Sequence, residues 1–141
     1  MSKTLVFALL AALVSGCSDA CKNSTVSTVT APGGDLKASL FQRDCGATTG
    51  FSSQVSITNI AGGPSGAGNV FVADTDHGAA STATWGGPWV EVRWLSPQDL
   101  LIRYDASARV FTQNESVSGV NISYEKVTGN VRFGSKAELG R

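Results

Sequence analysis

The sequence contains few of the groups on which catalysis and nucleic-acid binding depend. It has one histidine in 141 residues, and only 16% of its residues are charged. The 11 Lys and Arg residues balance the 11 Asp and Glu residues without forming a basic run, so nucleic acid is not an expected partner. A Gly-X-Ser-X-Gly nucleophile motif and a second histidine for proton relay are both missing. We therefore expect a protein that is not an enzyme and uses no cofactor.

The chain after residue 17 also lacks apolar stripes at helical spacing. Apolar and polar residues alternate instead with a period of two, and the 16 glycines and many Val, Thr and Ser residues favour strands and turns. The expected strands are those that contain Val26 and Val29; Leu36, Ala38 and Leu40; Val55 and Ile57; Val70 and Val72; Val90, Val92 and Trp94; Leu100, Ile102 and Tyr104; Val110 and Phe111; and Val120, Ile122 and Tyr124.

Two turn sequences separate neighbouring strands, Pro32-Gly33-Gly34-Asp35 and Ser96-Pro97-Gln98-Asp99. The predicted fold class is all-β. We expect a single small antiparallel meander, either a sandwich or a barrel, of about seven to eight strands after an N-terminal signal helix.

The first 17 residues have the pattern of an export signal. Lys3 supplies a positive start, and residues 5–14 form an apolar run that is shorter than the roughly 20 residues a membrane-spanning helix needs. The four residues Val14-Ser15-Gly16-Cys17 resemble the lipobox of bacterial lipoprotein precursors. The resemblance implies cleavage before Cys17 and attachment of fatty acyl chains such as palmitate to that residue. The alternative is an ordinary secretory signal with a cysteine near its cleavage site.

This pattern gives the expected organisation of the chain. It comprises a signal peptide over residues 1–16, a lipidated tether over 17–25, a β-domain over 26–127, and a partly disordered tail over 128–141. The implied partner is a membrane, held through Cys17, with the protein facing the periplasm of a bacterial cell envelope. Ser18 stands where Asp would mark retention in the inner membrane of enterobacterial lipoproteins, so the outer membrane is favoured.

Three cysteines are an odd number for an exported protein. Once Cys17 is assigned to lipid, Cys21 and Cys45 remain as an even pair in an oxidising compartment. A disulfide bond between them closes a loop of about 25 residues and contributes roughly 3 kcal/mol by restricting the unfolded chain. Two free thiols are the alternative. No Cys-X-X-Cys motif points to a metal or redox role.

The only histidine lies in the loop Asp74-Thr75-Asp76-His77-Gly78. Asp74, Asp76 and His77 are weak candidates for a divalent cation site, and His77 for a general base. The structural alternative is a turn in which the Asp side chains accept hydrogen bonds from nearby backbone amides. We expect the turn, and therefore no metal site.

Trp85-Gly86-Gly87-Pro88-Trp89 places two indoles around a flexible turn. If exposed, Trp85 and Trp89 offer a platform for a glycan or a partner protein, with His77 as a further possible binding residue. The alternative is that the two rings cover one open end of the fold.

Two longer segments carry a further resemblance. They are RDCGATTGFSSQVSI (residues 43–57) and GNVFVAD (residues 68–74). They resemble a family of short bacterial envelope lipoproteins that carry a domain of unknown function. The resemblance implies an envelope lipoprotein and implies no particular activity.

The leading functional hypothesis is therefore a lipid-anchored envelope protein that binds another envelope component or supports the envelope structurally, without catalysis. The alternative is a small envelope hydrolase or metal-dependent enzyme that uses the Asp74, Asp76 and His77 loop.

Overall fold

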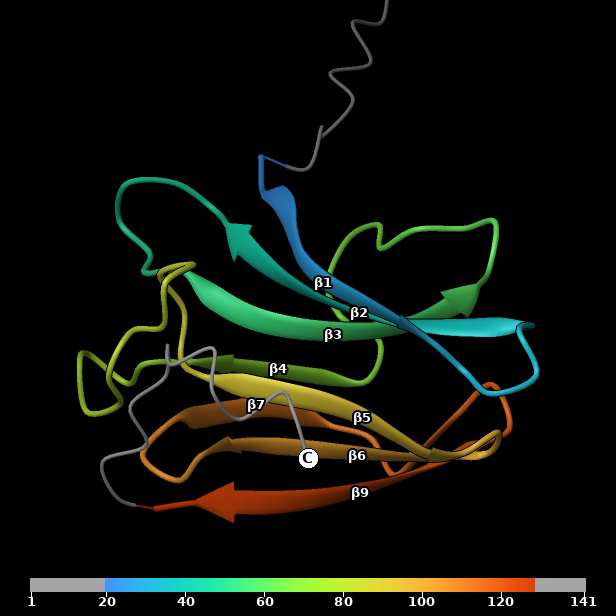
Figure 1. Cartoon of the computed structure of the whole chain (residues 1–141). Coiled ribbons are helices and arrows are strands. Elements are labelled where there is room, and N and C mark those ends of the chain that lie inside the picture. The colour runs from blue at the N-terminus through green and yellow to red at the C-terminus, as the bar shows by residue number, and fades with distance from the viewer. Residues whose placement is uncertain (1–19, 129–141) are drawn as a thin grey trace, which may run out of the picture.

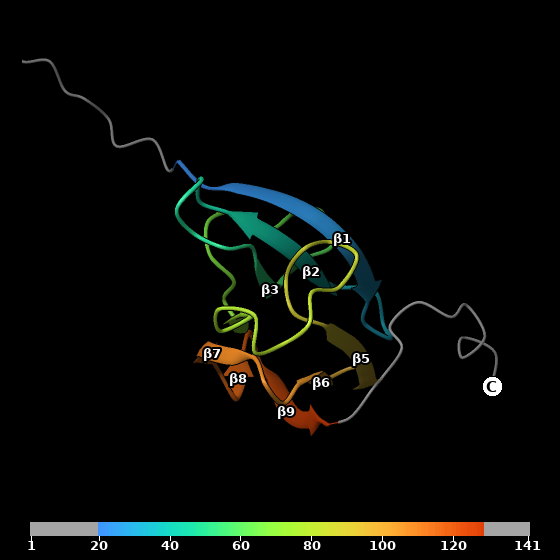
Figure 2. The same cartoon turned by 90° about the vertical axis from the view of Figure 1, so that its left-hand side faces the viewer.

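The computed structural model describes residues 20–128, which form two β-sheets packed face to face (Figures 1 and 2). The strands are β1 (Lys22–Thr30), β2 (Leu36–Asp44), β3 (Ser52–Asn59), β4 (Phe71–Asp74), β5 (Val90–Ser96), β6 (Asp99–Asp105), β7 (Arg109–Gln113), β8 (Ser116–Val117) and β9 (Val120–Val127). One sheet has the order β1-β2-β3-β4-β7 and the other the order β5-β6-β9-β8. Among the described residues no helix is long and apolar enough to cross a bilayer.

The all-β prediction is confirmed, and the described residues form an open sandwich and not a closed barrel. Eight of the nine strands are those expected from the alternation, and the ninth is the two-residue strand β8. The expected signal helix, the lipidation site Cys17 and the tail from residue 129 lie outside the described residues.

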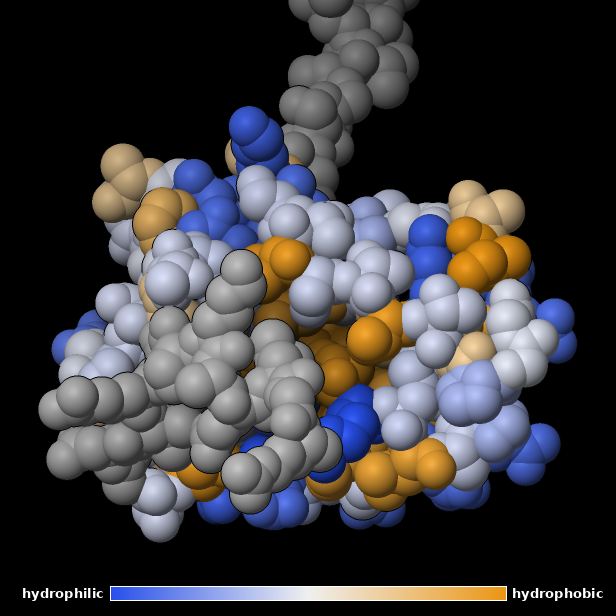
Figure 3. Space-filling model, viewed as in Figure 1, coloured by the Kyte–Doolittle hydropathy of each residue, from blue (hydrophilic) through white to orange (hydrophobic). Residues whose placement is uncertain are grey.

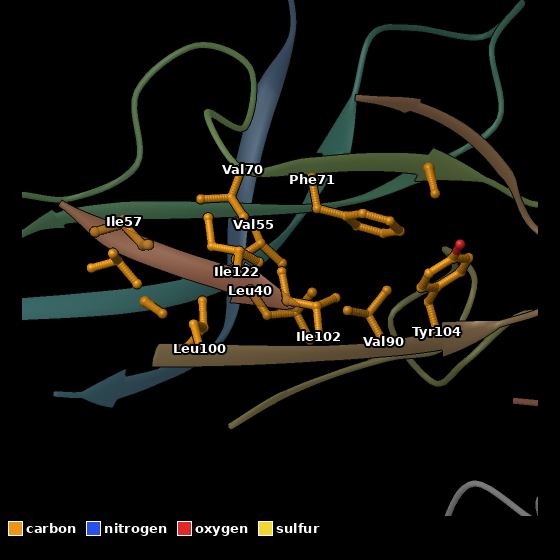
Figure 4. Packing of buried hydrophobic residues seen from close by; sticks show 13 residues of the cluster. Leu40, Val55, Ile57, Val70, Phe71, Val90, Leu100, Ile102, Tyr104 and Ile122 are labelled. Carbon is orange, nitrogen blue, oxygen red and sulfur yellow. The ribbon is translucent and has the colours of Figure 1, made fainter. Parts of the chain in front are cut away.

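The inner faces of the two sheets supply the core. They pack the expected alternating residues against one another, as Figure 4 shows from close by. The buried cluster consists of Ala38, Leu40, Val55, Ile57, Val70, Phe71, Ala73, Val90, Leu100, Ile102, Tyr104, Val120 and Ile122. The Phe71 and Tyr104 rings lie 5.0 Å apart between centroids and join the sheets directly. Burial of these two apolar faces is the main stabilising contribution to the fold.

Three details differ from the sequence prediction. Strand β1 begins at Lys22, so the last four residues of the expected 17–25 tether belong to the sheet.

In β4 the buried residues are Phe71 and Ala73, while Val72 lies on the opposite face, because Phe71 pairs with Val55 and fixes that register. Strands β6 and β9 pair in parallel, since β7 crosses to the other sheet before the chain returns.

The outer face of the five-stranded sheet is also buried in part, and it is polar. Gln54 and Ser56 of β3 are almost fully buried there. The connection between β3 and β4 covers them: the Gly68 amide donates to Gln54 Oε1 at 2.7 Å, and the Asn69 amide donates to Ser56 Oγ at 3.2 Å. The Asn69 side chain also bonds both backbone groups of Ile57, at 2.9 Å each, so the loop supplies hydrogen-bond partners to Gln54, Ser56 and Ile57. The Thr58 hydroxyl, further along the same face, is buried without a partner among the described residues.

The predicted disulfide bond between Cys21 and Cys45 is present. It lies directly beyond the pair formed by Lys22 and Asp44, at the open end of the β1–β2 hairpin. The other end of this hairpin closes at the expected turn, where the Gly34 amide donates to the Ala31 carbonyl at 2.9 Å. Strand β1 is an edge strand with mostly exposed side chains, so little apolar burial holds it in place. The disulfide bond compensates for this weakness.

We predict that replacing both Cys21 and Cys45 with serine lowers the free energy of unfolding by roughly 3 kcal/mol, because the unfolded chain regains the freedom of the closed loop. Urea denaturation followed by circular dichroism measures the change. Amide hydrogen exchange should accelerate in β1 before it does in β3. Unchanged urea midpoints for the double variant would contradict this role, and reduction of the wild-type protein provides the matched comparison.

Candidate functional site

Trp85, Trp89 and His77 were the expected binding residues, and the structure places them in three different surroundings. Trp85 lines an open groove at one end of the sandwich, and His77 lines a second cavity. Trp89 lies on the outer face of the four-stranded sheet. A single patch made of all three residues is therefore not formed.

The turn that carries Trp85 is held tightly against β3. The Ala83 amide donates to the Gly87 carbonyl at 2.8 Å, and the Gly86 amide donates to the Ala83 carbonyl at 2.9 Å. A Cβ atom on Gly87 would lie 2.4 Å from Ser53 Oγ, and one on Gly86 would lie 2.5 Å from the Phe51 ring. Gly86 also has a φ of 91°, which favours glycine. The two glycines between the tryptophans are therefore needed for close packing.

The Ser53 hydroxyl fixes the Trp85 ring. Trp85 Nε1 donates to Ser53 Oγ at 2.8 Å, and Ser53 donates in turn to the Pro88 carbonyl at 2.6 Å. Ser53 is fully buried, so the hydroxyl at the centre of this short relay is shielded from water. The Gln42 side-chain amide donates to the Trp85 carbonyl and connects the turn to β2. The position of Trp85 is thus set by neighbours on two strands.

The groove itself has a volume of about 520 Å³. Its aromatic members are Trp85 and Phe51, and Phe51 is 41% exposed. The other lining residues are Ser24, Thr25, Val26, Gln42, Thr84 and Gly86. They come from β1, from β2 and from the connection between β4 and β5, which passes between the two sheets at this end of the sandwich (Figure 2). Sequence patterns gave no indication that Phe51 and Gln42 would join Trp85.

Trp89 follows the expected strand alternation and faces away from the core. The Arg103 guanidinium lies 6.0 Å from the centre of its ring. Arg103 also forms ion pairs with Glu91 at 3.4 Å and Glu125 at 3.3 Å, and Arg93 pairs with Glu91 at 2.7 Å. This outer face is therefore a partly exposed network of charges that surrounds Trp89.

The His77 loop forms the expected turn. The Asp76 amide donates to Asp74 Oδ1 at 2.8 Å, and both Asp76 and His77 have positive φ angles, 50° and 55°. Arg109 binds the Asp74 carboxylate in a bidentate manner, at 2.6 and 3.2 Å. Within residues 20–128 no group of three His, Cys, Asp or Glu side chains is arranged to hold a metal ion.

Several neighbours shift the pKa of the Asp74 carboxyl. Partial burial raises the pKa of the Asp74 carboxyl, but the hydrogen bonds from Arg109 and the Asp76 amide, together with the Arg109 charge, outweigh this effect. The pKa of Asp74 therefore lies below its ordinary value, and the group is an ionised partner of Arg109.

The second cavity, of about 360 Å³, lies next to the groove. Asp74, His77 and Arg109 line it, together with Arg43 of β2. The segment around Phe51 separates the two hollows: Phe51 lines the groove, while Gly50 and Ser52 line the cavity.

No family model, no curated protein and no solved structure matches this chain.

We predict that Ser53→Ala lowers the free energy of unfolding by about 1–3 kcal/mol, because the Trp85 indole N–H and the Pro88 carbonyl both lose a buried partner. Urea denaturation measures the loss, and the fluorescence of the folded variant should shift to longer wavelength as Trp85 becomes more mobile and hydrated. Ser116→Ala, at an exposed position of β8, is the control and should change neither quantity. Equal stability of the two variants would show that the relay does not hold the turn.

We predict that Arg109→Met slightly lowers the free energy of unfolding near neutral pH, because it removes the cation that pairs with Asp74. The effect is small since the pair is partly exposed and screened by solvent. The folded-state pKa of Asp74 is depressed, so the contribution of the pair is present above the ordinary Asp value of about 4. It disappears as the pH falls through the lower folded-state pKa. Wild type and variant should therefore converge in urea denaturation at acidic pH.

An NMR titration of the Asp74 carboxyl carbon provides the direct measurement, with its pKa rising in Arg109→Met. Lys37→Met removes the same charge elsewhere on the sheet and should leave the Asp74 titration unchanged. An Asp74 titration that is insensitive to Arg109→Met would refute the assignment.

Proposed function

We propose that this chain is a lipid-anchored protein of the bacterial cell envelope that works as a binding module and not as an enzyme. Acyl chains on Cys17 attach it to a membrane, with the folded domain facing the periplasm and the outer membrane as the favoured location. Its partner is another envelope component, either a protein or a glycan.

The sequence supports the anchor. A positive residue, an apolar run and the Val14-Ser15-Gly16-Cys17 segment occur in the order of a lipoprotein signal. The resemblance of residues 43–57 and 68–74 to envelope lipoproteins points in the same direction. The Cys21–Cys45 bond suits an oxidising compartment and begins only four residues after the proposed anchor.

The groove beside Trp85 is the observation that carries the binding role. A concave surface with aromatic residues and a few hydrogen-bonding side chains is the usual form of a ligand site. None of its lining residues is charged, which also argues against nucleic acid as the ligand.

The hydrolase alternative has no comparable support. Arg109 holds the Asp74 carboxylate in an ion pair, and Arg109 Nη1 lies 3.7 Å from Asp76 Oδ1. A structural ion pair with Arg109 accounts for both carboxylates without a catalytic role.

We predict that Cys17→Ser releases the protein from the membrane, because one serine cannot carry the thioether-linked lipid. Fractionation of expressing cells should move the protein from the membrane pellet to the soluble periplasmic fraction. Intact mass of the wild-type protein should show a chain that begins at Cys17 with a diacyl or triacyl addition. Ser18→Ala is the control and should remain in the pellet. Retention of Cys17→Ser in the pellet, or an unmodified wild-type mass, would overturn the anchor.

The same soluble variant tests the binding role. Added to isolated envelopes, the Cys17→Ser protein should sediment with them in a saturable manner, because its partner is an envelope component. Sedimentation that never saturates, or none at all, would count against a specific partner.

A further inference from the structure

We infer that the groove between β1 and the Trp85 turn binds an uncharged saccharide. This inference rests on the proposed function and names the ligand class of the same site. The juxtaposition that carries it is an aromatic pair, Trp85 and Phe51, beside a rim of uncharged hydroxyl and amide side chains.

The lining of the groove selects for a neutral ligand. All eight of its residues are uncharged at neutral pH, and they are Ser24, Thr25, Val26, Gln42, Phe51, Thr84, Trp85 and Gly86. A phosphate, carboxylate or ammonium group placed here would lose water without gaining a partner of opposite charge. The charged side chains Arg43, Asp74 and Arg109 lie on the far side of the segment around Phe51, in the second cavity.

The aromatic pair gives the groove a surface for stacking. The faces of aromatic rings carry partial negative charge and attract the weakly positive C–H groups that one side of a pyranose ring presents. Ser53 and Gln42 hold the Trp85 turn, and Phe51 packs against Gly86, so both rings are placed before any ligand arrives. Little ordering is then lost on binding.

The rim suits a ligand that carries many hydroxyl groups. Ser24, Thr25 and Thr84 have hydroxyls that both donate and accept hydrogen bonds. Gln42, which also lines the groove, donates its amide N–H to the Trp85 carbonyl, and its side-chain oxygen is a further acceptor. An apolar peptide or a fatty acid would leave these polar groups without partners, whereas sugar hydroxyls satisfy them.

The position of the groove along the chain limits the source of the saccharide. Ser24 is seven residues after Cys17, so even a fully extended segment spans at most about 25 Å. With Cys17 in a membrane, the groove stays close to the bilayer surface. Two sources of the same chemistry are the neutral sugars of membrane glycolipids and the glycan strands of a cell-wall polymer.

The test uses the full mature chain carrying Cys17→Ser, titrated by isothermal calorimetry and by tryptophan fluorescence. Probes are neutral oligosaccharides of glucose and of N-acetylglucosamine, a sialylated oligosaccharide as the acidic comparison, and vesicles that contain a neutral glycolipid. We expect saturable binding of at least one neutral probe and a change in tryptophan emission. Binding of the soluble oligosaccharides points to a polymer as the source, and binding of the vesicles alone points to a glycolipid.

Variants locate the site. Phe51→Ala removes one partly exposed ring and should weaken binding about tenfold without unfolding the protein. Trp85→Phe, which keeps a ring but loses the bond to Ser53, should also weaken binding. Phe111→Ala, at a phenylalanine that is 60% exposed in the second cavity, is the matched control and should bind as the parent does. Thermal unfolding of each variant shows that it is folded.

Two results would overturn the inference. One is the absence of saturable binding by every neutral probe, or a preference for the acidic one. The other is equal binding by Phe51→Ala and Phe111→Ala. If neutral probes fail while the same protein still sediments with envelopes in a saturable manner, the ligand assignment is wrong and the proposed function stands. If both fail, the proposed binding role fails with it.

Discussion

The structure depends on two sheets that can bury their apolar faces only against each other. The inner residues of β2, β3 and β4 meet those of β5, β6 and β9, and the Phe71–Tyr104 contact lies across the interface. To build both sheets the chain must pass between them, from β4 to β5, from β6 to β7 and from β7 to β8. The longest of these passages, residues 75–89, contains the Trp85 turn. The groove is therefore a product of how the sandwich is closed. Figure 3 shows one face of the molecule, on which apolar residues are visible in the hollow between the two sheets.

The edge of the five-stranded sheet poses a different physical problem. Strand β1 contributes little to the core, and its free edge is rich in Ser, Thr and Val, a composition that favours pairing with other strands. Trp94 Nε1 donates to the Val29 carbonyl at 2.9 Å and ties this edge to β5 of the other sheet. The Cys21–Cys45 bond secures the opposite end. These two links hold in place a strand that also forms one wall of the groove and that directly follows the proposed anchor.

The sequence allowed most of the strands to be predicted because burial on one face imposes a period of two. Val70 is buried as expected, but the prediction was wrong at Val72, because residues 70–73 are all apolar and alternation cannot select a face. The pairing of Phe71 with Val55 determines which of these residues faces the core. The parallel pairing of β6 with β9 and the burial of the polar residue Gln54 could not be predicted from the sequence either, because both depend on which distant segments become neighbours. The disulfide bond was predictable because few pairings of three cysteines were available.

In the candidate site, too, the local sequence identified some of the residues, and the fold supplied neighbours that the sequence could not indicate. The sequence identified Trp85 and Trp89 as candidates. The turn between them, Gly86-Gly87-Pro88, places the two rings on different sides of the sandwich. Trp85 acquires Phe51 and Gln42 as neighbours, whereas Trp89 acquires Arg103 and its ion pairs. The ion pairs described above gather on that outer face and around Asp74. The groove has no fixed charge because none of the side chains that line it is ionisable, so binding of the proposed ligand would depend on ring stacking, shape and neutral hydrogen bonds.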